Sequence, residues 1–161
     1  MKITIWVREG TWPACVDAAR ELAGSRPAEV TLICVREASA GAPDTGFGSL
    51  IGRGRRRQAT EQLDQLGREA AETMLRQARE RLGQDAEVRL ESGFPERIVT
   101  AAAGDADYLI LGRDGDHTRL GPGSLGKHTR FVVDHAPCRV LLIWPGNAPA
   151  VGSIPPPPPD R

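Results

Sequence analysis

The stretch YLILGRDGDHTRLGPGSLGKHTRFVVDHAPCRVLLIW, residues 108–144, decides the fold of this chain. It begins with an apolar run at 108–111, which is typical of a strand covered on both faces of a sheet. A glycine-rich loop follows, then a helix that we expect to begin near Ser124, and then a second apolar strand at 139–144. This order predicts a strand, helix and strand unit of a parallel sheet.

The loop between these strands carries glycines that could hold an anion. Glycine lets consecutive backbone N–H groups approach a phosphate, and a helix that begins after the loop adds the positive end of its dipole. A phosphate or a nucleotide is therefore the first ligand to consider. The same glycines, with Pro122, also fit a surface loop without a ligand. The glycines are Gly112, Gly115, Gly123 and Gly126.

Strands and helices also alternate through the rest of the chain. We expect the first three strands at 2–7, 29–35 and 87–90. Pro13 and Pro95 each open a helical pattern, and a longer helix lies between them. The alternation predicts a doubly wound, Rossmann-like α/β fold. This fold has a five-stranded parallel sheet in the order 3-2-1-4-5, with helices on both faces.

The longer helix, which Gly83 closes, has an apolar face and a basic start. Its apolar residues recur at three- and four-residue spacing, and its other face is charged. Arginines at a helix start oppose the helix dipole. The basic run is therefore either a solvated helix start or a contact for an anion or an acidic partner. The apolar residues are Leu63, Leu66, Ala70, Met74, Ala78 and Leu82, and the arginines are Arg53, Arg55, Arg56 and Arg57.

Composition and charge indicate one globular domain, residues 1–145, in a chain of 161 residues with 40% hydrophobic content. Lys plus Arg and Asp plus Glu both number 21, so no net charge attracts the protein to nucleic acid or to acidic membranes. We expect neither as a partner. Residues 1–7 lack the form of a signal peptide, and no apolar run reaches membrane-spanning length. A cytoplasmic location is therefore expected.

The last segment, 146–161, is proline-rich, and we expect it to be disordered. Consecutive prolines at 155–159 favour polyproline geometry without internal hydrogen bonds. Such a tract either stays solvated or docks on the aromatic groove of a protein that recognises proline-rich segments.

The reactive residue types form no recognisable catalytic or metal-binding set. The cysteines lack a C-x-x-C pair and lie in apolar surroundings, so we expect buried, reduced thiols. The histidines lack the spacing of a metal site, and we predict no metal. No pairing of a nucleophile with a base supports an enzyme. These residues are Cys15, Cys34, Cys138, His117, His128 and His135.

Three motifs together resemble the universal stress protein family: Gly-Phe-Pro at 93–95, ADYLILG at 106–112 and HAPCRVLL at 135–142. The resemblance covers residues 2–144. It implies a small cytoplasmic α/β protein, commonly a homodimer, that is produced under stress. One branch of the family binds ATP and another does not. We expect a homodimer through the strand at 139–144, because this strand lies at the edge of the predicted sheet.

The ATP-binding branch resembled here uses Gly-x-x-Gly, then nine residues, then Gly followed by Ser or Thr. Gly112 and Gly115 match the first pair. The final pair corresponds to 126–127 after ten residues, or to 123–124 after seven. Ser at 124 can donate a hydroxyl to a phosphate or cap the helix, and Lys at 127 can supply a point charge.

The same branch has an aspartate at the end of the first strand, where this chain has Arg8. An arginine accepts no hydrogen bond, so it cannot replace a carboxylate that receives donors from the nucleoside. Glu9 could substitute only through a bulge. Alternatively, Arg8 pairs with Asp114 or Glu9 and fills the crevice. The candidate nucleotide-site residues are Gly112, Arg113, Gly115, Ser124, Gly126, Lys127, His128, Arg8 and Val35.

Three functions are compatible with these residues. The first is a regulatory module of a stress response whose glycine loop binds ATP or a related adenine nucleotide. The second is a dimeric interaction module that binds no nucleotide. The third is a weak ATPase.

Overall fold

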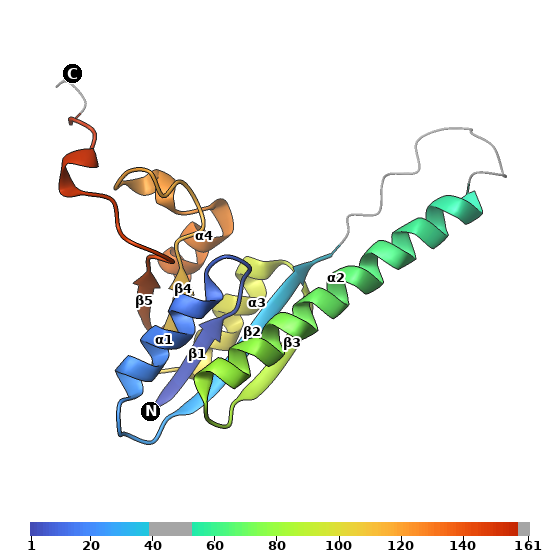
Figure 1. The fold of residues 1–161 in the computed structure, drawn as a ribbon, viewed down its shortest axis with the longest axis horizontal. Helices are drawn as coiled ribbons and strands as arrows, with labels where there is room; N and C mark the ends of the chain where they lie inside the picture. The colour runs from blue at the N-terminus through green and yellow to red at the C-terminus, as the bar shows by residue number, and fades with distance from the viewer. Residues whose placement is uncertain (39–52, 158–161) are drawn as a thin grey trace.

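A computed structural model describes residues 1–38 and 53–157 of the chain. Its centre is a five-stranded sheet in the order β3-β2-β1-β4-β5 (Figure 1). Each neighbouring pair of strands is parallel. The predicted fold class and strand order are therefore confirmed. The strands are β1 Lys2–Trp6, β2 Glu29–Glu37, β3 Glu87–Gly93, β4 Tyr108–Gly112 and β5 Arg139–Ile143.

Four α-helices of the described residues cover the two faces of this sheet. α1 and α2 contact each other over one face, and α3 and α4 contact each other over the opposite face (Figure 1). Pro13 lies in the first turn of α1 and Pro95 opens α3, as predicted. The helices are α1 Trp12–Ala23, α2 Arg53–Leu82, α3 Pro95–Ala102 and α4 Lys127–His135.

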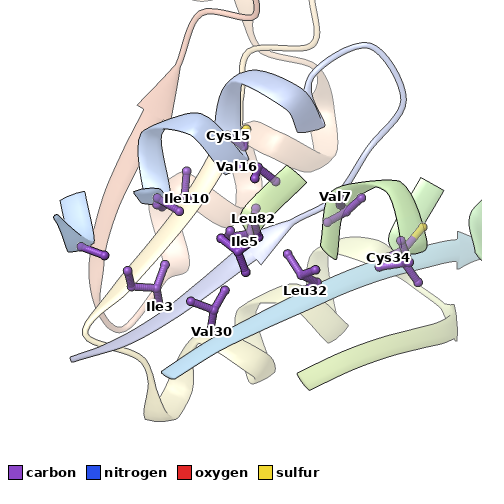
Figure 2. Close-up of a cluster of buried hydrophobic side chains, with 14 of the residues drawn as sticks. Ile3, Ile5, Val7, Cys15, Val16, Val30, Leu32, Cys34, Leu82 and Ile110 are labelled. Atoms are coloured by element: carbon purple, nitrogen blue, oxygen red, sulfur yellow. The ribbon is translucent and has the colours of Figure 1, made fainter. Parts of the chain in front are cut away.

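Successive residues of the central strands enter two separate hydrophobic cores. Ile3, Ile5 and Val7 belong to the core under α1 and α2, which Figure 2 shows. Trp6 instead packs with α3 and α4. Side chains alternate between the faces of a strand, so a sheet covered on both faces buries every residue of such a run. This explains the continuous apolar run that predicted β4.

α2 extends beyond the sheet at its N-terminal end, and its start agrees with the basic run expected at the helix start. It begins at Arg53, and its C-terminal half packs against the sheet. Residues 54–70 are exposed, and Figure 1 shows this end of α2 projecting beyond the strands. Leu63 and Leu66, the first members of the predicted apolar face, are 70% and 61% exposed. The buried residues of the C-terminal half are Ala71, Leu75, Ala78 and Leu82.

The segments before α4 and after β5 are irregular. A 3-10 turn, Pro122–Ser124, precedes α4, which begins at Lys127 and not near Ser124 as expected. Residues 146–157 include one 3-10 turn, Val151–Ser153, and the hydroxyl of Ser153 accepts the N–H of Leu120 at 3.0 Å.

Residues 39–52 and the end of the proline-rich tail, at 158–161, lie outside the described residues. The division into a domain and a disordered tail stays a prediction. Among the described helices, none combines the length and the apolar character needed to span a membrane.

Candidate functional site

The glycine loop faces the end of β1, as the strand order predicted. β1 and β4 are parallel neighbours, with Ile5 opposite Ile110. Arg8, which follows β1, therefore reaches Asp114, which follows β4. Nη1 of Arg8 lies 2.6 Å from Oδ2 of Asp114. The structure thus contains the pair that the sequence offered as an alternative to nucleoside recognition.

The other carboxylate oxygen of Asp114 lies at the N-terminus of α4. Oδ1 accepts the N–H of Gly126, the residue before the helix, at 2.8 Å. Helix N-termini favour anions, because their N–H groups lack intrahelical partners and the dipole is positive there. A Cβ on Gly126 would lie 2.7 Å from Oδ2 of Asp114. Glycine at this position therefore accommodates the protein's own carboxylate.

The guanidinium of Arg8 is held by two further groups. Nη1 donates to Oγ1 of Thr129 on α4 at 2.9 Å. The guanidinium also lies over the ring of Trp6, 4.5 Å from its centroid, an arrangement that attracts a cation to the ring. The side chains of Arg8 and Asp114 are only 32% and 15% exposed, so water screens their attraction less than that of a surface pair. Arg8 thus links β1 to α4 across the glycine loop.

The pKa of Asp114 lies below its ordinary value. Burial of the carboxyl group raises the pKa, but the N–H of Gly126, the charge of Arg8 and the side-chain hydrogen bonds of Thr129 and Arg8 together lower it by more. Asp114 is therefore ionised near neutral pH. The loop consequently already holds a negative charge at the helix N-terminus, where a phosphate would bring another.

Other backbone donors of the loop bind the loop itself. The N–H of Gly115 donates to the carbonyl of Ser124, and the N–H of Asp116 donates to the carbonyl of Gly123, both at 2.9 Å. A Cβ on Gly115 would overlap the carbonyl oxygen of Gly123. The closed loop therefore requires glycine at position 115 whether or not a ligand binds.

Arg113 and Ser124 brace this closed loop. Nη1 of Arg113 donates to Oγ of Ser124, and the Ser124 hydroxyl donates to the carbonyl of Gly121 at 2.8 Å. The guanidinium of Arg113 also lies over the ring of Trp144, 4.6 Å from its centroid. The Ser124 hydroxyl, which the sequence offered as a phosphate donor, is thus engaged within the loop.

His128 lies between two carboxylates that the sequence analysis did not connect with the site. Nδ1 is 2.6 Å from Oε2 of Glu96 at the start of α3. Nε2 is 3.2 Å from Oε1 of Glu37 at the end of β2, without hydrogen-bond geometry. A hydrogen bond from its own backbone N–H lowers the pKa of Glu96, burial opposes this, and His128 lowers it further. Only the fold brings these three elements together, so no local motif could have revealed the cluster.

The remaining predicted site residues surround the Arg8–Asp114 pair. Val35 of β2 packs against the core under α3 and α4. Gly112 ends β4, where a Cβ would overlap Thr11. Lys127 is exposed at the first residue of α4. The fold thus gathers the predicted residues at one end of the sheet.

The cysteines and acidic residues add no further chemistry to this site. Cys15 and Cys34 are buried free thiols, and Cys138 is half-buried. Burial raises the pKa of Cys15 to about 12, so its reactive thiolate form is scarce near neutral pH. Within residues 1–38 and 53–157, no group of three His, Cys, Asp or Glu side chains is placed to hold a metal ion.

A model of the universal stress protein family matches residues 11–143, which include the glycine loop and both strands that flank it. This chain belongs to that family. The match confirms the resemblance carried by the three sequence motifs. No curated protein matches the chain.

Solved structures of low sequence identity share the universal stress protein fold with this chain. The hypothetical protein MJ0577 is 20% identical, with a TM-score of 0.65 over 91% of this chain and 97% of that one. A universal stress protein in complex with cAMP is 18% identical, with a TM-score of 0.61 over 91% and 98%. UspA from Lactobacillus plantarum is 19% identical, with a TM-score of 0.59 over 89% and 97%. These likenesses support the fold alone.

The glycine loop of this universal stress protein does not fit a phosphate in the conformation observed. A phosphate at the start of α4 would compete with Asp114 for the N–H of Gly126. It would also approach the ionised Asp114 carboxylate, and like charges at short range repel.

Proposed function

We propose that this universal stress protein is a non-catalytic regulatory module of a stress response whose glycine loop is closed by its own carboxylate. The observation that carries the proposal is Asp114, which accepts from Gly126 with one oxygen and from Arg8 with the other. This arrangement favours the alternative in which the module acts through protein contacts and not through a bound nucleotide.

The closed loop opposes ATP for two separate reasons. Removing Asp114 from the helix N-terminus breaks two charge-assisted hydrogen bonds, which are stronger than neutral ones. Arg8, which Trp6 and Thr129 hold in place, also offers no acceptor to a nucleoside. ATP would have to compensate for the free energy of displacing Asp114 and for the missing acceptor at Arg8.

Calorimetric titration with ATP and with cAMP tests this proposal. We expect no saturable binding to the parent protein, and binding of ATP to Asp114→Ala, because this change frees the Gly126 N–H and leaves Arg8 available to a phosphate. Asp116→Ala is the matched control, since Asp116 lies in the same loop but its carboxylate contacts Thr118. Saturable ATP binding by the parent, or no gain in ATP affinity in Asp114→Ala over Asp116→Ala, would contradict the proposal.

Binding of ATP or a related adenine nucleotide is the second candidate function. Lys127 supports it, because its side chain is exposed beside the helix N-terminus that Asp114 occupies. The related structure in complex with cAMP supports it too. The parent would then bind the nucleotide, and Lys127→Ala would weaken binding by about 1.5–3 kcal/mol. Release of phosphate from ATP would distinguish a weak ATPase from simple binding.

The regulatory module is further proposed to be a cytoplasmic homodimer. β5 lies at one edge of the sheet, and residues 140–143 are half-buried. An edge strand offers unpaired backbone groups to a second strand, and a two-fold axis would pair β5 with β5 of a second copy. The proline-rich tail remains a proposed contact for another protein, and its last residues lie outside the described chain.

A further inference from the structure

The projecting end of α2 carries an apolar stripe that the rest of the described structure does not cover. Leu63 and Leu66 are the most exposed leucines there, and the stripe continues toward the body through Ala70 and Met74. Ala70 and Met74 line a groove of about 800 Å³ between α2 and the start of α1, which includes Trp12. An isolated helix gains little stability from its own hydrogen bonds, so a projecting amphipathic helix needs a partner surface.

Charges that lack an ion-pair partner among the described residues lie at both ends of this stripe. Arg55 and Arg56 are exposed near the tip of α2, and neither joins an ion pair within the described chain, whereas Arg57 pairs with Glu61. Glu9 and Glu69 line the groove at the other end of the stripe, and neither is in an ion pair there. Arg36 also lines the groove, but Asp64 of α2 pairs with it at 2.6 Å. The tip is therefore basic, and the unpaired charges of the groove are acidic.

Within one chain these charges cannot meet. Arg55 and Glu69 are separated by about 21 Å along α2, because a helix rises about 1.5 Å per residue. Arg56 lies two turns before Leu63, and Arg55 lies about three turns before Leu66, so both arginines share the face of the leucines. The basic groups and the apolar stripe consequently form one continuous surface.

We propose that the α2 helices of two copies of this chain pair antiparallel along this surface. Leu63 packs against Leu66 of the partner subunit, and the two-fold axis makes the same contact twice. Arg55 and Arg56 then reach the groove that holds Glu69 of the partner subunit. This interface is separate from β5, and it goes beyond the proposed regulatory function.

Charge specifies the antiparallel arrangement. A parallel pair would place the two basic tips side by side, and like charges at close range destabilise an interface. In a single copy the arginines at the start of α2 oppose the helix dipole. An antiparallel partner offsets that cost, because it brings acidic side chains to the basic tip and aligns the two dipoles in opposite directions.

Light scattering after size-exclusion chromatography tests the interface through the particle mass. We expect the double variant Leu63→Lys with Leu66→Lys to have half the mass of the parent, whether or not β5 also forms a dimer. Both side chains are exposed, so circular dichroism should show an intact fold. Val151→Lys is the control, because Val151 is exposed but lies outside α2, and this variant should keep the parent mass.

A charge exchange tests the orientation. Arg55→Glu with Arg56→Glu should halve the mass, even though acidic residues at a helix start favour the isolated helix. Adding Glu9→Lys and Glu69→Lys to the same chain should restore the parent mass. A monomeric parent, an unchanged mass in the double-lysine variant, or no recovery after the charge exchange would overturn the proposal. The nucleotide titrations and a Leu142→Lys variant report on the proposed function and on β5 independently of these outcomes.

Discussion

Asp114 determines the electrostatics of the glycine loop, and its protonation should be visible in stability. Its pKa is lower in the folded protein than in the unfolded chain, where it is about 4. Its charge therefore stabilises the fold above about pH 4, and this contribution is lost as the pH falls through the folded pKa. We expect Asp114→Asn to lower the free energy of unfolding near pH 7 by about 1 kcal/mol.

Urea unfolding at several pH values checks this expectation. The parent and Asp114→Asn should converge in acid, because a protonated aspartate resembles asparagine. A difference between the two proteins that stays constant as the pH is lowered into strong acid would contradict the assigned role of the charge.

Substitutions of the loop glycines distinguish a role of glycine in local packing from a role in ligand binding. Gly115→Ala should lower stability by about 1–3 kcal/mol without any nucleotide, because its Cβ would overlap the Gly123 carbonyl oxygen. Gly123→Ala is the matched control, since no heavy atom lies within 4 Å of a Cβ built there. Thermal unfolding of the two variants measures the difference. Equal melting temperatures would show that the loop is more open than the structure indicates.

At the scale of elements, the sequence predicted those strands and helices that a local pattern of apolar residues marks. The run at 108–111 identified a buried strand, since both faces of the sheet are covered, and the strand order placed the glycine loop opposite Arg8. The spacing of the apolar residues in α2 identified which face of the helix is apolar. It could not show where along the helix the underlying sheet ends. Leu63 and Leu66 therefore shared the pattern of Leu82 without sharing its burial.

The contacts of the site were only partly predictable, because they join distant elements. Arg8 and Asp114 followed from the strand order, which places the ends of β1 and β4 together. The contact of Arg8 with Thr129 and the contact of His128 with Glu96 depend on how α4 and α3 pack, and no spacing in the sequence encodes that packing. The spacing of the glycines alone could not reveal that the Asp114 carboxylate occupies the position expected for a bound anion.

For the whole molecule, the open edges of the sheet make assembly the main remaining prediction. β5 and β3 are the two edge strands, but they differ in chemistry. β3 alternates charged and apolar residues, which protects an edge from pairing, whereas β5 is aliphatic after Arg139. Association through β5 is therefore favoured, in agreement with the homodimer that the family resemblance implies.

Leu142→Lys should abolish this β5 contact and halve the particle mass measured by light scattering. Leu142 is only partly buried beside the core under α3 and α4, so a charged side chain there would lose more hydration in the paired state than in the separated one. Val88→Lys on β3 is the matched control, because Val88 is an exposed apolar residue of the opposite edge. Circular dichroism should show that both variants remain folded. A parent mass retained by Leu142→Lys, or lost equally in Val88→Lys, would exclude β5 as the interface.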